Sequence, residues 1–207
     1  MRNLIIGLSL GGAIILLSGC QSAPKTSVGR DGVTYTNTIH NFRVWAADQF
    51  NPAELKGKTL SVAATASEVA EQKKKDEIEQ FERLRRLLPD QISYALESKK
   101  VFAKVNQPAV TEGTDLKLNT TIVEYYPGNA ALRFTVGFSA GYPSITVHGT
   151  ITDAAGKPLV RFETQREFEA RPFEYGDEQI LSNNIKDLAV DLADFIDRIA
   201  NGKPLKR

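Results

Sequence analysis

Few side chains in this chain of 207 residues could carry out chemistry. It holds one cysteine, Cys20, and two histidines, His40 and His148. These are too few for a zinc site of the Cys/His type, and no other metal-binding spacing occurs. A nucleophilic serine or threonine would need a base held by a third group, and we expect His148 to be solvated on the polar face of a strand. The sequence therefore predicts no metal, no cofactor and no nucleophilic site.

Three carboxylates share one face of a predicted strand. Such a group can mimic the paired acids of general acid–base catalysis; its members are Glu163, Glu167 and Glu169. Arg161 and Arg171 are near enough in sequence to neutralise them. Charged residues on the open side of a sheet are normally just solvated. We therefore expect that the protein is not an enzyme.

The composition fits one globular domain. Hydrophobic residues make up 42% of the chain and charged residues 25%, close to the globular average, which argues against disordered and fibrous classes. Lys and Arg number 26 against 25 Asp and Glu, a formal net charge of +1. This balance lacks the basic excess of nucleic-acid binders, so no nucleic-acid partner is expected.

The first twenty residues have the parts of a secretory signal. Arg2 and the amino terminus supply positive charge, an apolar run follows from Leu4 to Leu17, and small residues precede Cys20. The run of roughly 14 residues is shorter than the roughly 20 that a bilayer-spanning helix needs, and it suits the core of a signal peptide. An uncleaved anchor helix, or an ordinary signal followed by a chance cysteine, are the alternatives.

The segment Leu17-Ser18-Gly19-Cys20 resembles a bacterial lipobox. The resemblance implies transfer of diacylglycerol to the Cys20 thiol, cleavage after Gly19 and acylation of the new amino group, with palmitate as the expected fatty acid. Two or more acyl chains give stable membrane attachment. Gln21, rather than Asp, follows the cysteine, which in Gram-negative lipoproteins implies the periplasmic face of the outer membrane. Inner-membrane anchoring and a Gram-positive cell membrane are the alternatives.

The chain divides into four predicted parts: a cleaved signal peptide (1–19), a lipidated N-terminus and flexible tether (20–37), a single periplasmic domain (38–202) and a basic tail (203–207). The tether is rich in small and polar residues that cannot bury enough apolar surface to order themselves. Within the domain, apolar residues at helical spacing predict helices over 67–88 and 177–201. Pro89 breaks or kinks the first helix, or starts a second one at Asp90.

Shorter apolar runs predict strands near 42–45, 59–66, 101–105 and 116–126. Period-2 alternation over 132–138, 145–152 and 160–168 then predicts an antiparallel meander with one buried face. The expected fold is α+β: a two-layer sandwich of a mostly antiparallel sheet (β-meander) with two long amphipathic helices on one face. The other sheet face would be uncovered and polar, and would carry Arg133, Thr135, Thr146, His148, Thr150, Arg161, Glu163 and Gln165.

Part of the meander resembles a bacterial family defined only as a domain of unknown function. The resemblance rests on Gly128–Phe134, on Val136–Gly141 (VGFSAG), and on Asp153 with Gly156-Lys157. The hallmarks of that family are an R-x-x-V-G-F-G-A-G stretch and a D-x-x-T-G-K turn, and its members are typically secreted or lipid-anchored. Here Ser139 replaces a glycine, and alanines precede Gly156 where the family tends to have threonine. More distantly, the element order resembles accessory domains of envelope lipoproteins.

A broad polar sheet face suits a protein partner better than a small ligand, which favours a concave apolar pocket. We therefore expect a non-enzymatic, lipid-anchored envelope protein that binds or organises another envelope protein, through this face or an edge strand. The alternative is a small-ligand carrier with a pocket between sheet and helices, lined by Phe134, Phe162 and Phe195.

One loop is a candidate for the contact with the partner. Two glycines there permit unusual backbone angles or a close backbone approach, and two aromatic side chains could be exposed. The residues are Gly137, Phe138, Gly141 and Tyr142. A β-bulge, or a corner that lets the sheet curve over its helices, is the alternative interpretation of the same glycines.

Overall fold

The computed structural model describes residues 27–28, 34–35, 37–39, 42–46, 50–69, 74–107, 113–128, 142–168 and 177–203. Cys20 and the predicted signal peptide lie outside the described residues, as do Arg133, Phe134 and Thr135. Among the residues that are described, no helix combines the length and the apolar character needed to cross a bilayer.

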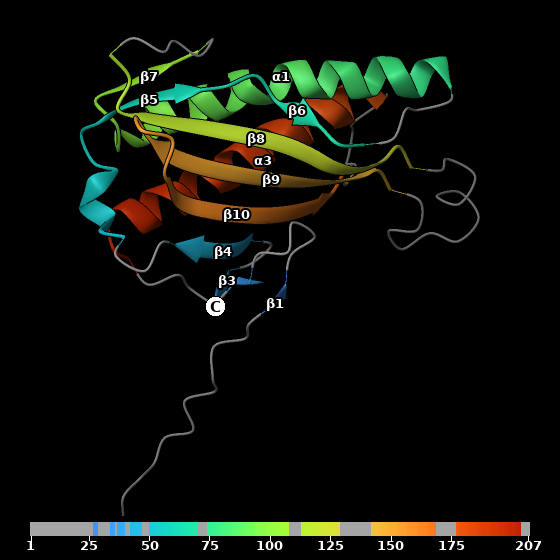
Figure 1. Cartoon of the computed structure of the whole chain (residues 1–207). Helices are drawn as coiled ribbons and strands as arrows, with labels where there is room; N and C mark the ends of the chain where they lie inside the picture. Colours follow the sequence, from blue (N-terminus) through green and yellow to red (C-terminus); the bar gives the residue numbers. More distant parts are fainter. Residues whose placement is uncertain are drawn as a thin grey trace, which may run out of the picture.

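An eight-stranded sheet forms the body of the molecule, with strand order β3-β4-β10-β9-β8-β5-β7 and with β6 paired to β8 (Figure 1). The strands are β3 (Asn37–Ile39), β4 (Phe42–Ala46), β5 (Thr59–Val62), β6 (Ala66–Ser67), β7 (Lys104–Asn106), β8 (Leu116–Tyr126), β9 (Ser144–Asp153) and β10 (Pro158–Glu167). A turn of 3-10 helix, η1 (Pro52–Glu54), precedes β5. Two further short strands, β1 (Ser27–Val28) and β2 (Thr34–Tyr35), pair only with each other and fall within the predicted tether.

The α+β class is confirmed, and the meander is confirmed in part. β8, β9 and β10 follow one another as antiparallel neighbours, and β4 also pairs with β10 in the antiparallel direction. The other half of the sheet is parallel, because β5 runs in the same direction as both β7 and β8, and β6 in the same direction as β8. A helical crossover between β5 and β7 makes parallel pairing possible. The predicted strand 132–138 lies outside the described residues.

The crossover is helix α1 (Lys75–Lys99), which differs from the predicted helix at both ends. It begins later because Ala66 and Ser67 pair with β8 as a strand. It also continues past Pro89, whose ring is buried within the helix. Proline removes one helical hydrogen bond, but Ile92 and Leu96 beyond it are fully buried and keep the second half of the helix on the core.

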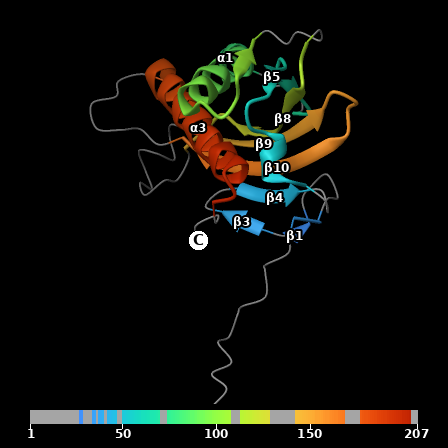
Figure 2. The same ribbon diagram turned by 90° about the vertical axis from the view of Figure 1, so that its left-hand side faces the viewer.

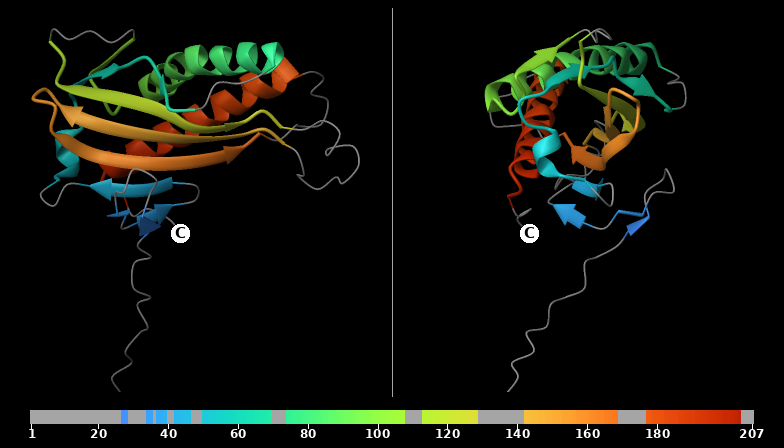
Figure 3. Two further views of the ribbon diagram at one scale, coloured as in Figure 1. Left: turned by 45° about the vertical axis from the view of Figure 1, so that its right-hand side comes forward. Right: turned by 60° about the vertical axis from the view of Figure 1, so that its left-hand side comes forward.

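Helix α3 (Asp177–Ala200) matches the predicted last helix, and Gly202 just beyond its end has a φ of +57°. Both helices cover the same face of the sheet (Figures 2 and 3). The buried faces of the strands and the apolar stripes of the helices form one core. Two layers of this kind bury one face of each element and leave the second face of the sheet without a helix.

A strand glycine shapes the centre of this core. Gly149 on β9 lies directly opposite Phe162 on β10. A side chain at position 149 would have its Cβ 1.9 Å from Cζ of Phe162, so the ring lies over the glycine. From the helix layer, Phe195 packs edge-on against the same ring, with 5.6 Å between the ring centroids. The glycine thus lets a large aromatic side chain fill the space between sheet and helix.

Candidate functional site

The sheet face opposite the helices is the candidate site, and we call it the open face; it comprises the side chains of β8, β9 and β10 that point away from α1 and α3. Figure 1 views the sheet from this side, with α3 behind it. In β9, Ile145, Val147 and Ile151 are buried on the helix side, and Thr146, His148 and Thr150 alternate onto the open face. The strand register confirms the predicted grouping for its six described members, because it pairs Arg161 with Thr150, Glu163 with His148 and Gln165 with Thr146.

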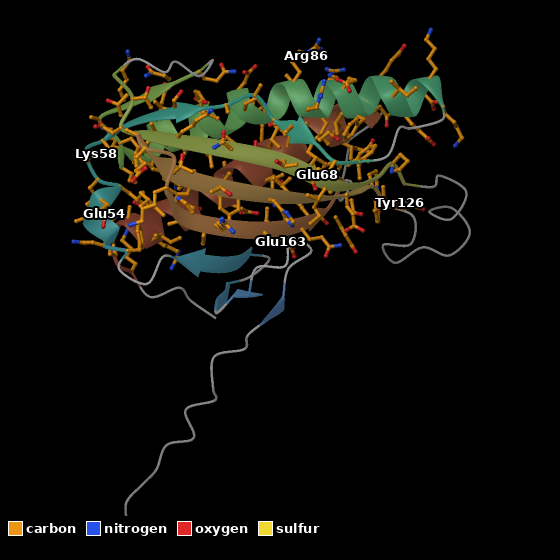
Figure 4. The ribbon with its side chains drawn as sticks, viewed as in Figure 1. Glu54, Lys58, Glu68, Arg86, Tyr126 and Glu163 are labelled. Atoms are coloured by element: carbon orange, nitrogen blue, oxygen red, sulfur yellow. The ribbon has the colours of Figure 1, made fainter. Side chains whose placement is uncertain are left out.

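A hydrogen bond between a histidine and a glutamate crosses the open face between two strands. Nε2 of His148 lies 2.8 Å from Oε2 of Glu163, and the two side chains are only 16% and 9% exposed. Figure 4 labels Glu163 on β10. The prediction that His148 is solvated was wrong, because the β9–β10 register places a carboxylate directly opposite the imidazole. Side chains in directly opposed positions of an antiparallel pair are close enough to bond.

A second polar contact joins β9 to its other neighbour. The Thr146 hydroxyl donates to Oε2 of Glu124 over 3.0 Å. The β8–β9 register shifts between Ile122 and Glu124, and this irregularity places Glu124 opposite Thr146. Thr146 is 5% exposed, although no helix covers it. Several polar side chains of the open face are therefore fixed by their neighbours across the strands.

The three predicted carboxylates do not form a cluster in the described structure. Glu163 is buried against His148, Glu167 is exposed near the end of β10, and Glu169 lies outside the described residues. Arg161 is half-buried opposite Thr150. No group of three or more His, Cys, Asp or Glu suited to a metal ion occurs among the described residues.

A second charged group lies on the helix side of β10, and no sequence pattern predicted it. Arg166 donates from Nη1 to Oδ2 of Asp191 over 2.5 Å and from Nη2 to Oδ2 of Asp187 over 3.1 Å. Both carboxylates belong to α3 at a spacing of four residues, so one guanidinium joins the end of β10 to two turns of the helix. Burial raises the pKa of the Asp191 carboxyl, and the nearby Arg166 charge opposes that rise. Only the packing of α3 on the sheet brings these residues together.

The predicted contact loop is described only at its end. Tyr142 is half-buried, whereas Gly137, Phe138 and Gly141 lie outside the described residues. Tyr126 and Ser144 are the last paired residues of β8 and β9 at this end of the sheet. The loop therefore connects two strands of the open face.

The predicted ligand pocket is not supported at the residues described. Phe162 and Phe195 are 0% and 3% exposed and pack against each other, so their rings occupy the space that a ligand would need. Two hollows, of about 420 and about 520 Å³, lie away from these two phenylalanines and have charged side chains in their linings. Neither resembles the mostly apolar site that a hydrophobic ligand requires.

Comparison with known proteins identifies a family but no activity. Residues 44–171 match a family described as "Domain of unknown function (DUF4410)". No curated protein sequence matches the chain.

Several solved structures are similar to parts of the chain. A PelC dodecamer from Paraburkholderia phytofirmans is 12% identical, with a TM-score of 0.43 over 73% of this chain and 96% of that one. A minor lipoprotein from Acinetobacter baumannii is 16% identical, with a TM-score of 0.31 over 70% and 94%. Uncharacterized lipoprotein B from Nitrosomonas europaea is 8% identical, with a TM-score of 0.38 over 77% and 95%. Likenesses at these TM-scores say nothing about what this chain does.

Proposed function

Because the chain belongs to the DUF4410 family, whose function is unknown, we propose a role from its own residues. The protein is a lipid-anchored component of the bacterial cell envelope, without enzymatic activity, that binds another envelope protein through the open face of its sheet. The lipobox-like segment ending at Cys20 supports the anchor, and Gln21 supports the periplasmic face of the outer membrane.

The observation that carries the binding role is the fixed polar surface of the open face. The His148–Glu163 and Thr146–Glu124 contacts hold side chains from three neighbouring strands in defined positions. A surface whose side chains are already fixed loses less conformational entropy when a partner binds. Such a face favours a protein partner whose own surface offers hydrogen-bonding groups, since threonine hydroxyls both donate and accept.

The absence of enzymatic activity is part of the proposal. Catalysis by a nucleophile requires a base and a third, orienting group within hydrogen-bond reach. In the described residues, Nε2 of His148 lies 2.8 Å from Oε2 of Glu163. In this proposal, the His148–Glu163 pair serves to fix side-chain positions on the open face.

Site-specific photo-crosslinking in intact cells tests the role. A photoreactive amino acid would replace Thr121 or Gln165 on the open face, or Tyr142 at the loop. Asp90, exposed on the opposite layer in α1, is the matched control position. We expect one dominant envelope protein to crosslink from the open-face positions and not from Asp90. Equal products from all four positions, or none from Thr121 and Gln165, would count against the proposal.

A further inference from the structure

A hollow of about 420 Å³ lies at the end of the sheet where three chain segments meet: the turn after η1, the turn between α1 and β7, and the end of α3. Figure 2 looks onto this end of the molecule. The lining includes three lysines, Lys56, Lys99 and Lys100, and one carboxylate, Asp197. The volume falls within the roughly 300–1,000 Å³ that is usual for small-molecule sites.

The charges at the hollow do not balance. Lys99 is paired with Asp194 of α3. Asp197, the acid in the lining, already accepts from Nζ of Lys203 over 2.9 Å and from Nδ2 of Asn201 over 2.7 Å. Lys56 and Lys100, in contrast, have no ion pair with any residue in the described part of the chain. Two of the three lysines in the lining are thus without an acidic partner among the described residues.

The backbone at Lys100 gives an independent indication. Its φ is +54°, and it is the only residue other than glycine with a positive φ among those described. At the end of α3, Gly202 has nearly the same φ of +57°. Glycine adopts this conformation without strain, whereas a side chain makes it less favourable. A lysine at the end of α1 therefore lines the hollow in spite of an unfavourable backbone angle.

Complementing the α1 dipole would explain only part of this arrangement. Cations near a helix C-terminus stabilise the helix, and Lys99 and Lys100 occupy such positions. Lys56 does not, because it lies in the turn that leads into β5. Its presence beside Lys100 indicates that the two charges act on something in the hollow.

We propose that this hollow binds a phosphate group, which is a second binding function, separate from the open face. A phosphate group carries negative charge and several acceptor oxygens, so it can accept from two ammonium groups at once. Lysines act as point charges, without the planar fork of arginine, so they suit a tetrahedral anion. The phosphate can belong to a soluble molecule or to a phospholipid headgroup of the membrane.

The test measures how fast an amine-reactive reagent modifies individual lysines of the purified full chain in neutral detergent, read by mass spectrometry. Pyrophosphate is the soluble probe. Mixed micelles of the detergent with phosphatidylglycerol, compared with mixed micelles with phosphatidylcholine, are the lipid probe. We expect labelling of Lys56 and Lys100 to slow at least several-fold, with no change at Lys157, which is exposed in the β9–β10 turn. Protection by pyrophosphate assigns a soluble ligand, and protection only by phosphatidylglycerol assigns a headgroup.

Two variants separate binding from folding. Lys100→Gly removes an ammonium group but suits the local backbone, so it folds and loses the protection of Lys56. Lys56→Gln in turn loses the protection of Lys100, while Lys157→Gln leaves both protected. Protection that survives in Lys100→Gly and Lys56→Gln, or no protection by either probe, would overturn the proposal.

Discussion

The ring of Phe162 occupies the space that a side chain at position 149 would need. We expect Gly149→Ala to destabilise the protein by about 2–3 kcal/mol, because the ring must leave its place between β9 and Phe195, and overpacked cores lose about this much. Urea denaturation followed by circular dichroism would measure the loss.

A second substitution tests the cause. Phe162→Leu removes the part of the ring that meets position 149, so Gly149→Ala should cost much less in that background. The double-mutant cycle would then show a coupling free energy above about 1 kcal/mol. Additive effects of the two substitutions would mean that the glycine is needed for another reason.

Lys100 offers an opposite case, in which a substitution improves stability. Its φ of +54° lies in the left-handed region, where glycine is unstrained. We expect Lys100→Gly to raise the free energy of unfolding by about 0.5–1 kcal/mol, even after the loss of a cation near the helix C-terminus. The midpoint of urea denaturation measures it. A lower midpoint would show that the lysine stabilises the end of α1.

At the scale of elements, local patterns predicted what local interactions decide. The alternation in β9 and β10 and the helical stripe of α3 are each set by one buried face, and the structure confirms them. β8 occupies the predicted residues 116–126. The predicted start of α1 was wrong because the pairing of β6 with β8 depends on residues more than fifty positions apart. The parallel pairing of β5 had no local signal for the same reason.

The same difference between local patterns and long-range pairing decides which features of the candidate site could be predicted. Alternation predicted which residues of β9 and β10 share the open face. It did not predict that His148 meets Glu163, because the β9–β10 register decides which side chains stand opposite one another. The contact between Thr146 and Glu124 depends in addition on a register shift in β8 that the sequence does not mark.

The Arg166 link between β10 and α3 predicts a pH dependence. Burial raises the pKa of Asp191 in the folded state above its ordinary value of 3.8. The folded state therefore holds this proton more tightly than the unfolded chain does. Stability from Asp191 is present below pH 3.8 and is lost as the pH rises through the raised pKa.

The substitution Asp191→Asn should remove the loss of stability that accompanies the ionisation of Asp191. We expect the free energy of unfolding of the wild type, minus that of the variant, to fall as the pH rises from about 4 to about 6. Urea titrations of both proteins across this range would measure the difference. A difference that is constant with pH, or that grows, would contradict the raised pKa.

At the scale of the whole molecule, the proposed lipid anchor and the folded body would make separate contributions to membrane attachment. Cleavage after Gly19 would remove Arg2, so that the remaining Lys and Arg side chains equal the 25 Asp and Glu. A body without net charge gains little from a charged membrane surface, and salt screens what local attraction there is. Attachment then depends on the acyl chains at Cys20.

Fractionation of cells tests whether membrane attachment depends on the acyl chains at Cys20 rather than on surface charge. We expect a wash with about 1 M salt, which reduces the screening length to about 3 Å, to leave the protein in the membrane fraction, and mild detergent to release it. A clickable palmitate analogue should label the wild type and not Cys20→Ser. If salt alone released the protein, or if Cys20→Ser were labelled equally, the protein would be attached through its surface or through another residue. The proposed lipid anchor at Cys20 would then need a different explanation.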